Sequence, residues 1–348
     1  MDMEVKIGAE VRIDCPDLHL SENCTIGIPK PEMVLSAEKV FIRCSRLELG
    51  AGCVIEPGVV ITGGFVKLAP GCRISSGVKI RVEEWLELGK NSVINPNCLI
   101  EGRRIRIGRE LWCGPEVRIG GGSCFEPQSE LTAGYWLHLG MRAFVNTARP
   151  VTIGNEVGIG TNSAIYTHGA YQSLLQGFPV AFAPVTIGDN CWLPGAIVNP
   201  GVTIGVNTVI GVGSVVTRNI PAGALAAGVP CRVIKENVFP RPLTADERRK
   251  FFGDFFPVAG TILAHHLRQE FQFDPQNLNL IVGAATLTYW KNTITVDTRT
   301  STTLFDLLHR QIHGPVTPLT EKLRDLLRRY GIRFKSEPVN NTYQPWEE

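Results

Sequence analysis

Aliphatic residues recur at every sixth position along most of the chain. The clearest members form five triplets with this spacing: Leu49, Ile55 and Ile61; Leu68, Ile74 and Ile80; Leu88, Ile94 and Ile100; Ile153, Ile159 and Ile165; and Ile204, Ile210 and Val216. The pattern begins near the N-terminus, with Ile7 and Ile13 and then Leu20 and Ile26. A period of six matches neither a helix nor the alternation of a single strand. It predicts a triangular solenoid of stacked coils, in which each of three short sides turns one aliphatic side chain inward.

Two segments interrupt the pattern. It weakens over residues 121–138 and resumes at Leu139. It is interrupted again after Ile165, by the long segment 166–184. Because a loop of that length in a regular solenoid is usually functional or mobile, and because it leaves the coil where His168 stands, we expect a functional site there.

The pattern changes after Lys235. Residues 239–242 read as a linker, and Thr244–Glu247 forms a capping box that predicts a helix to about residue 270. Strands are expected at 279–282, 293–296 and 304–313, and a second helix at 318–330, ending before Gly331. We therefore expect two domains: a β-helix solenoid over residues 1–238 and a small α+β domain over 239–348.

Composition fits many short strands with frequent corners. Glycine (36) and proline (23) together make up about 17% of the 348 residues, against roughly 12% in ordinary proteins. These residues supply the corners of the coils. Four of the ten cysteines, namely Cys53, Cys72, Cys98 and Cys191, occupy the small-residue position next to a corner. We interpret them as buried thiols that fill space, without a redox or metal-binding role.

Charge and termini narrow the class of protein. The 35 basic and 33 acidic residues are balanced, which argues against a dedicated nucleic-acid binder. The N-terminus has no signal-peptide pattern, and no run of eighteen apolar residues occurs. We therefore expect a cytoplasmic protein with reduced cysteines and no membrane span.

The C-terminal half of the solenoid carries a specific set of motifs: Val185–Trp192, Pro200–Gly205, Ile210–Pro221 and Ala227–Lys235. In this order they resemble the hexapeptide-repeat acyltransferases, and most of all the maltose/galactoside O-acetyltransferases. The resemblance implies a left-handed parallel β-helix, a hand that the periodicity alone does not give. It also implies acetyl-CoA as the acyl donor, no metal, and a homotrimer with the active site between adjacent subunits.

The same resemblance gives His168 the role of general base. A sugar hydroxyl is a poor nucleophile at neutral pH, and an imidazole can accept its proton as it attacks a thioester carbonyl. The acetyl group would pass directly from coenzyme A to the hydroxyl, without an acyl-enzyme. The alternative is that His168 is only a polar loop residue.

Other positions match the family's binding residues. Asn146 and Trp192 are expected to bind the acceptor, although Asn146 also suits an ordinary turn and Trp192 could pack against a neighbouring subunit. For coenzyme A, the resemblance implies that the backbone groups of Gly195, Val212 and Gly213 bind the pantetheine arm, with Thr217 and Arg218 nearby. It also implies that Arg232 and Lys235 face the phosphates. Each cation could equally be a solvated side chain.

The sequence departs from the family in two places. The side that runs from Leu193 to Val198 is one residue short, so that corner must be tightened and the assignment of Gly195 could shift by one position. The chain also begins in repeat, where the sugar acetyltransferases usually begin with a helical segment that shapes the acceptor site. The donor is therefore better defined than the acceptor.

We expect an acetyl-CoA-dependent O-acetyltransferase acting on a hydroxyl of a sugar or polysaccharide precursor. The alternatives are N-acetylation of an amino sugar, which uses the same fold and base, and a solenoid scaffold without activity. A γ-type carbonic anhydrase needs three zinc-binding histidines. Only His168 is suitably placed near the matching coils, so the sequence argues against this enzyme class.

Overall fold

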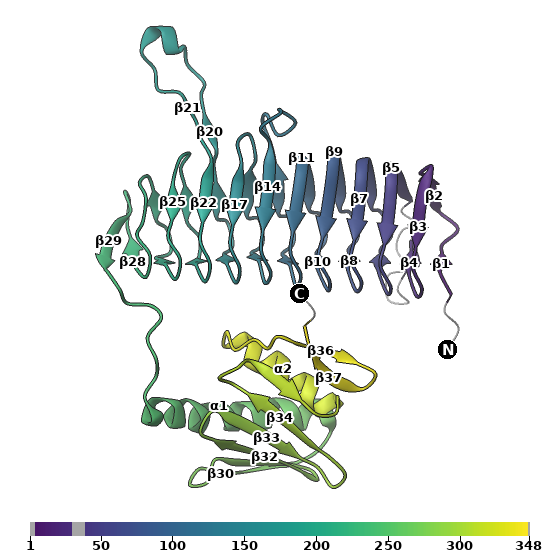
Figure 1. The fold of residues 1–348 in the computed structure, drawn as a ribbon, viewed down its shortest axis with the longest axis vertical. Helices are drawn as coiled ribbons and strands as arrows, with labels where there is room; N and C mark the ends of the chain where they lie inside the picture. The colour runs from purple at the N-terminus through teal and green to yellow at the C-terminus, as the bar shows by residue number, and fades with distance from the viewer. Residues whose placement is uncertain (1–3, 30–38, 347–348) are drawn as a thin grey trace. The chain divides into compact units, whose positions relative to one another are not determined.

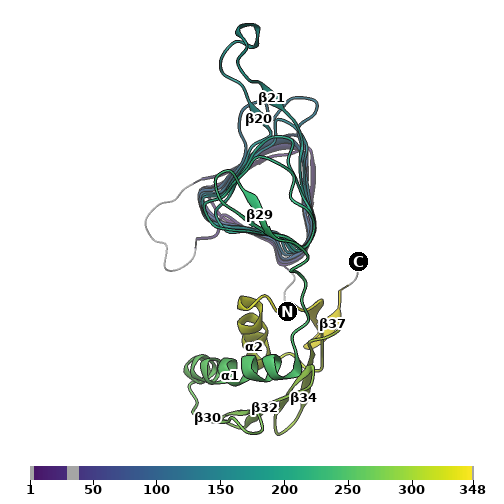
Figure 2. The ribbon, with the colours of Figure 1, turned by 90° about the vertical axis from the view of Figure 1, so that its left-hand side faces the viewer.

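The structure is a computed structural model that describes residues 4–29 and 39–346. The chain divides into two units, Met1–Arg241 and Pro242–Glu348, and each is described by itself. The first unit is a left-handed parallel β-helix with a triangular cross-section, visible along its axis in Figure 2. The solenoid predicted from the six-residue period is therefore confirmed.

Two sheets form the three sides of the β-helix. One side is a 12-stranded sheet in the described residues, and the other two sides share a 15-stranded sheet. They share it because long strands bend around the corner between them: β11 pairs with β13 through Leu99 and Ile100, and with β14 through residues 104–107. Strands of successive coils pair in parallel, except that the last strand, β29, runs antiparallel to β28 (Figure 1).

The strands of both sheets are short. The 12-stranded sheet has β1 (Lys6–Ile7), β4 (Thr25–Ile26), β6 (Val54–Ile55), β8 (Arg73–Ile74), β10 (Val93–Ile94), β12 (Trp112–Cys113), β15 (His138–Leu139), β18 (Gly158–Ile159), β23 (Trp192–Leu193), β26 (Val209–Ile210), β28 (Leu225–Ala227) and β29 (Arg232–Lys235). The 15-stranded sheet has β2 (Val11–Asp14), β3 (Asp17–Leu20), β5 (Val40–Leu49), β7 (Val60–Leu68), β9 (Lys79–Leu88), β11 (Leu99–Ile107), β13 (Arg118–Gly120), β14 (Glu130–Ala133), β16 (Phe144–Asn146), β17 (Val151–Ile153), β19 (Ala164–Ile165), β22 (Val185–Ile187), β24 (Ile197–Val198), β25 (Thr203–Ile204) and β27 (Val215–Val216).

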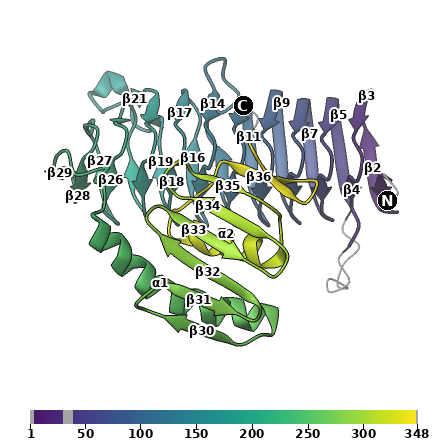
Figure 3. The same cartoon turned by 60° about the horizontal axis from the view of Figure 1, so that its bottom comes forward.

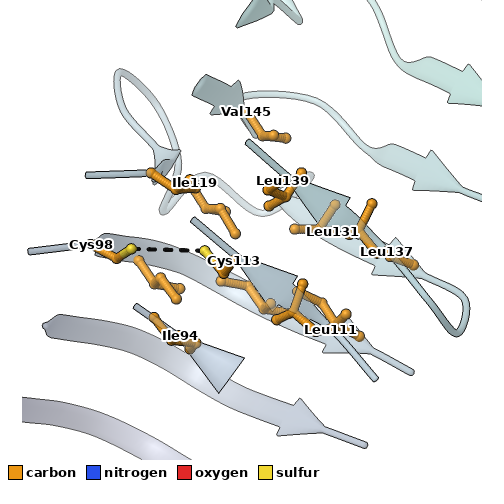
Figure 4. Close-up of a cluster of buried hydrophobic side chains, with 14 of the residues drawn as sticks. Ile94, Cys98, Leu111, Cys113, Ile119, Leu131, Leu137, Leu139 and Val145 are labelled. Atoms are coloured by element: carbon orange, nitrogen blue, oxygen red, sulfur yellow. Dashed lines mark hydrogen bonds between the residues drawn. The ribbon is translucent and has the colours of Figure 1, made fainter. Parts of the chain in front are cut away.

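The predicted aliphatic positions form one continuous core along the axis. All fifteen residues of the five triplets are buried. Figure 4 shows part of this core, where Ile94, Leu139 and Val145 point into the same interior as Cys98 and Cys113. Near the N-terminus the prediction is partly wrong, because Ile7 is exposed in the first coil, which has a neighbouring coil on one side only.

The cysteines fill the core as expected. All ten are free thiols, and Cys53, Cys72, Cys98 and Cys191 are buried. Burial raises the pKa of the Cys191 thiol to about 11, so this thiol stays protonated at neutral pH.

One corner of the coils needs left-handed backbone. Gly58 and Gly77 occupy it with φ of 78° and 71°, and Asn97 and Asn162 occupy the same place in later coils with φ of 62° and 57°. Glycine has no Cβ to clash in this conformation, and asparagine tolerates it better than most residues. This requirement explains part of the glycine excess.

The second unit is an α+β fold. Six antiparallel strands form a meander in chain order (Figure 3): β30 (Phe271–Asp274), β31 (Asn279–Val282), β32 (Ala285–Trp290), β33 (Thr293–Asp297), β34 (Thr302–Asp306) and β35 (Gln311–His313). Helix α1 (Ala245–Leu267) packs on β30 and β31, and helix α2 (Pro318–Arg329) packs on α1. A hairpin follows, formed by β36 (Ser336–Val339) and β37 (Thr342–Pro345).

Most of the expected elements of this unit are present. The Thr244 hydroxyl accepts the amide of Glu247 and the Glu247 carboxylate accepts the amide of Thr244, so the capping box is confirmed. The single strand expected at 304–313 is wrong, since Asp306 accepts the amides of Leu308 and His309 and turns the chain between β34 and β35. Neither helix of the described residues is long and apolar enough to cross a membrane.

Candidate active site

Two segments leave the β-helix at the same corner. The segment between β13 and β14 forms turns, and the segment 168–184 forms a projecting arm. The arm contains β20 (His168–Gly169), the 3₁₀ helix η1 (Leu174–Gln176) and β21 (Ala181–Phe182), and its two strands pair antiparallel. Figures 1 and 2 show both segments projecting from the same edge of the triangle. His168 lies at the base of the arm, as the break in the repeat predicts.

A buried asparagine holds the His168 ring. Asn146, at the end of β16 one coil earlier, is 0% exposed. Its Oδ1 lies 2.9 Å from His168 Nδ1. An amide oxygen only accepts hydrogen bonds, so Nδ1 carries the proton and Nε2 keeps a free lone pair.

The surroundings of Asn146 fix which end of its amide faces His168. Nδ2 donates to the carbonyl oxygens of Gly120 (3.0 Å) and Gly122 (3.3 Å). On the other side, Oδ1 accepts the amides of Ala148 (3.3 Å) and Thr167 (3.4 Å). Because two carbonyl groups lie on one side and two N–H groups on the other, only this orientation of the Asn146 amide satisfies all four hydrogen bonds. Asn146 is therefore held in the orientation that places its Oδ1 at His168 Nδ1, and its expected contact with the acceptor stays a prediction.

The other side of the His168 ring is partly open. Phe182 on the arm stacks on the imidazole, with centroids 5.6 Å apart and planes at 20°. The Arg149 guanidinium carbon lies 4.8 Å from the centroid of the same Phe182 ring. A Cβ added to Gly122 would lie 3.4 Å from His168 Nε2, so the missing side chain leaves space beside the nitrogen that keeps its lone pair. This side of the imidazole can receive a hydroxyl group.

Trp192 does not join this cluster within one chain. It lies on β23 of the 12-stranded sheet, whereas Asn146 belongs to the 15-stranded sheet. Its side chain is 56% exposed and covers Gly158 of the preceding coil, where an added Cβ would lie 3.2 Å from the Trp192 Cδ1 atom. The expected acceptor contact of Trp192 stays a prediction.

The corner predicted to be one residue short is tightened. Three residues, 194–196, connect Leu193 to β24, whereas four connect Ile159 to β19. The Gly195 amide donates to the Leu193 carbonyl (2.9 Å) and to the Ser163 hydroxyl (3.1 Å), and Ser163 also accepts the Ala196 amide (3.2 Å). The strands regain register at once, because Ile165 pairs with Val198.

This corner also bears on the expected coenzyme A contacts. The Gly195 N–H is already used within the corner, and its carbonyl accepts the Gly213 amide at 2.9 Å. Val212, between these glycine corners, is 79% exposed, and its main chain makes no hydrogen bond within the described residues. An added Cβ on Gly213 would meet nothing within 4 Å. The Val212 main chain is thus free to bind a ligand, and the surface beside Gly213 is open, whereas the Gly195 and Gly213 amides are already bonded.

The remaining expected residues cluster around β27. Thr217 and Arg218 directly follow this strand and are exposed. Arg232 and Lys235 are the two ends of β29 and are also exposed. The two segments are joined by a hydrogen bond from the Cys231 amide to the Val215 carbonyl (2.8 Å). The structure thus brings the three arginine and lysine side chains to the final coils of the β-helix.

Several residues of the site were not expected from the sequence. Gly120, Gly122 and Thr167 bind Asn146, and Phe182 stacks on His168. The run of three glycines at 120–122, where the repeat weakens, was the available signal. Among the described residues, no group of three or more histidine, cysteine or acidic side chains could hold a metal ion.

Comparisons with known proteins agree on one kind of enzyme. No family model matches the chain. It is 36% identical over 174 residues to a putative acetyltransferase of Saccharomyces cerevisiae, a match that covers 46% of this chain and 83% of the yeast protein. It is 39% identical over 127 residues to the galactoside O-acetyltransferase of Escherichia coli, covering 34% of this chain and 63% of that enzyme.

Among the solved structures, the chain matches the hexapeptide-repeat acetyltransferase of Vibrio cholerae in complex with acetyl coenzyme A. It is 28% identical to this chain, with a TM-score of 0.27. The match covers 34% of this chain and 60% of that protein. The chain thus spans less than two thirds of the Escherichia coli enzyme and of the Vibrio protein.

Proposed function

The chain belongs to the hexapeptide-repeat acetyltransferases, and on that premise we propose that it transfers an acetyl group from acetyl-CoA to a hydroxyl of a sugar or polysaccharide precursor. Family membership supports acetyl transfer, and the galactoside O-acetyltransferase among its relatives supports a carbohydrate acceptor. The observation that carries the proposal is the hydrogen bond from His168 Nδ1 to Asn146 Oδ1. It leaves a basic nitrogen on an imidazole beside an open position.

In the proposed reaction, His168 Nε2 takes the proton of the acceptor hydroxyl while the hydroxyl oxygen attacks the thioester carbonyl carbon of acetyl-CoA. The tetrahedral intermediate collapses with cleavage of the carbon–sulfur bond. The thiolate of coenzyme A then takes the proton from His168, which restores the neutral ring. Asn146 Oδ1 accepts the Nδ1–H throughout and stabilises the imidazolium that exists between the two proton transfers.

Acetyl-CoA would be held by the final coils. The exposed Val212 main chain and the open side of Gly213 suit a pantetheine arm, which can lie against backbone and bond to it. Thr217 lies beside them. Arg218, Arg232 and Lys235 are exposed cations that suit phosphate groups. Gly195 would contribute through its corner shape, since its N–H is already bonded.

The proposal includes a homotrimer. The arm carries large apolar side chains that its own chain leaves uncovered: Tyr171 is 95% exposed and Leu175 is 98% exposed. Side chains of this kind are normally covered by a partner surface. A neighbouring subunit would also be needed to bring Trp192 to the acceptor site. A molar mass of one chain in light scattering would contradict the trimer.

The proposal places the enzyme in the cytoplasm. All ten cysteines are free thiols, as expected in a reducing compartment. Fractionation of cells that express the chain fused to a fluorescent protein would test this assignment directly.

The test of the function is a transfer assay with acetyl-CoA and a panel of neutral sugars, acidic sugars and amino sugars, with mass detection of the product. We expect an O-acetylated sugar with stoichiometric release of coenzyme A. Acetylation of amino groups alone would replace the proposal with N-acetylation. The absence of both transfer and coenzyme A binding at millimolar ligand would indicate an inactive scaffold.

A further inference from the structure

A groove with basic side chains lies in the N-terminal half of the β-helix. Its volume is about 570 Å³, and its lining includes Lys39, Lys79, Asn97, Leu99 and Arg118. This volume is in the range of sites that bind small molecules. The lining comes from successive coils at one corner, so the groove runs across the coils.

Two of the basic residues in the groove have no acidic partner. The Lys79 and Arg118 side chains are exposed and make no ion pair or hydrogen bond within the described residues. Several other cations of the β-helix are paired with acids, for example Arg73 with Glu56 (3.1 Å) and Arg106 with Glu87 (3.0 Å). Unpaired cations that face one groove favour an anionic ligand.

Among the described residues the groove lining contains no acidic side chain, and neither Glu10 nor Glu116 pairs with Lys79 or Arg118. Glu10 lies 3.8 Å from Lys39. Glu116 occupies the corner two residues before Arg118 and is not part of the lining. The lining formed by the described residues therefore carries three cations, Lys39, Lys79 and Arg118, and no acidic side chain.

The groove and the candidate active site share a strand. Arg118 is the first residue of β13, and Gly120, the last residue, accepts the hydrogen bond of Asn146 Nδ2. Across the sheet, Lys79 pairs with Leu99, which pairs with Arg118. The next two partners on the same row are Phe144 and Ala164. At ~4.8 Å between strands, the row from Lys79 to the coil of His168 is about 19 Å long.

Aromatic rings lie between the cations and the histidine. Phe144 is the direct neighbour of Arg118 in the sheet, and the Tyr166 ring lies 5.6 Å from the Phe144 ring. Tyr166 is exposed and precedes His168 by two residues. Aromatic rings present flat apolar surfaces, which suit the apolar face of a sugar ring.

We propose that this groove binds acidic units of an extended carbohydrate chain whose hydroxyl is acetylated at His168, so that the acceptor class is a carboxylate-bearing oligosaccharide or polysaccharide. The inference rests on the proposed acetyltransferase function and names its acceptor. Arg118 and Lys79 bind sugar carboxylates, and Arg118 can do so with two parallel hydrogen bonds. A row of about 19 Å fits a chain of sugars, not a single one.

The first experiment measures binding by calorimetry, with oligogalacturonate as the acidic probe and maltooligosaccharide of equal length as the neutral one. The test variant is Lys79→Gln/Arg118→Gln. The matched control is Lys6→Gln/Arg299→Gln, which removes two exposed cations outside the groove. We expect the intact chain and the control to bind oligogalacturonate at least 10-fold more tightly than the groove variant, with affinity falling as salt is raised.

Equal binding of oligogalacturonate by the groove variant, or no preference of the intact chain for the acidic probe, would overturn the inference. The second experiment repeats the transfer assay with both probes and with small neutral sugars. Transfer to neutral sugars that is unaffected by Lys79→Gln/Arg118→Gln, without a preference for acidic chains, would leave the proposed function and refute the groove. Absence of transfer to every sugar, with binding at the groove retained, would refute the function instead.

Discussion

Replacing Asn146 with alanine separates the positioning of His168 from the rest of the fold. In the proposed reaction the imidazolium donates Nδ1–H to Asn146 Oδ1, and these atoms lie 2.9 Å apart in the structure. A hydrogen bond to a charged group contributes about 1.5–3 kcal/mol. Because each 1.36 kcal/mol changes a rate tenfold, kcat should fall by about 10- to 160-fold. The KM for acetyl-CoA should not change, because the expected donor site lies on other coils.

The same substitution removes partners from buried groups, so stability must be measured alongside activity. The amides of Ala148 and Thr167 lose their acceptor, which costs about 1–3 kcal/mol for each group left unpaired. Ser129→Ala is the control, because this buried hydroxyl donates to Thr147 (3.4 Å) beside Asn146 without touching His168. Circular dichroism and thermal unfolding show whether each variant is folded at the assay temperature.

A second variant distinguishes positioning from stability by the pH profile. Asn146→Asp keeps an oxygen near Nδ1 and adds a negative charge, which in the variant stabilises the imidazolium relative to the neutral ring. The base form is then reached only at higher pH, so the acid limb of kcat/KM should move to higher pH. An Asn146→Ala enzyme that is folded and has wild-type kcat, together with an unshifted acid limb for Asn146→Asp, would refute the positioning role.

Three further substitutions, the first with a matched control, test other parts of the molecule. Gly122→Ala places a methyl group 3.4 Å from His168 Nε2 and should lower kcat/KM for the acceptor at least ~10-fold in the transfer assay. Gly169→Ala is the control: its added methyl group meets nothing within 4 Å, so kcat/KM should stay unchanged. Ser163→Ala leaves the buried Ala196 amide without its partner and should lower the free energy of unfolding by about 1–3 kcal/mol in urea titration; an unchanged midpoint would contradict the account of the short corner. Thr244→Ala breaks the capping box and should destabilise the second unit by about 1 kcal/mol, measured as a lower unfolding temperature of that unit with activity retained.

The core of the β-helix could be predicted because every side of a coil places the same residue type inward. Fifteen aliphatic positions identified by spacing alone are buried. The short corner could be predicted as well, since Leu193 and Val198 lie five residues apart and both must point inward. The hand of the helix came from the resemblance, because an inward residue every six positions suits either hand.

The environment of Asn146 could not be predicted, because it depends on contacts between coils. Gly120 and Asn146 are 26 residues apart in the sequence, and Asn146 and His168 are 22 apart. The size of each loop between coils decides which residues meet at the corner, and periodicity does not give that size. The sequence therefore pointed to both residues, but not to the hydrogen bond between them.

The second unit was predicted where a local signal existed. The capping box and the glycine after α2 marked the helices. Strand β32 alternates buried and half-buried residues up to the exposed Trp290, a pattern from which this strand could also have been expected. The turn at Asp306 depends on a side chain that accepts two amides, which the strand-like composition of residues 304–313 concealed.

The central claim is that His168 is the base for acetyl transfer. The most direct measurement compares wild-type enzyme with His168→Ala for transfer of acetyl from acetyl-CoA to an acceptor sugar, with mass detection of the product. The account predicts a loss of about 10²- to 10⁴-fold in kcat, with unchanged binding of coenzyme A and an unchanged unfolding temperature. A folded His168→Ala variant that acetylates the same sugar at the wild-type rate would contradict it.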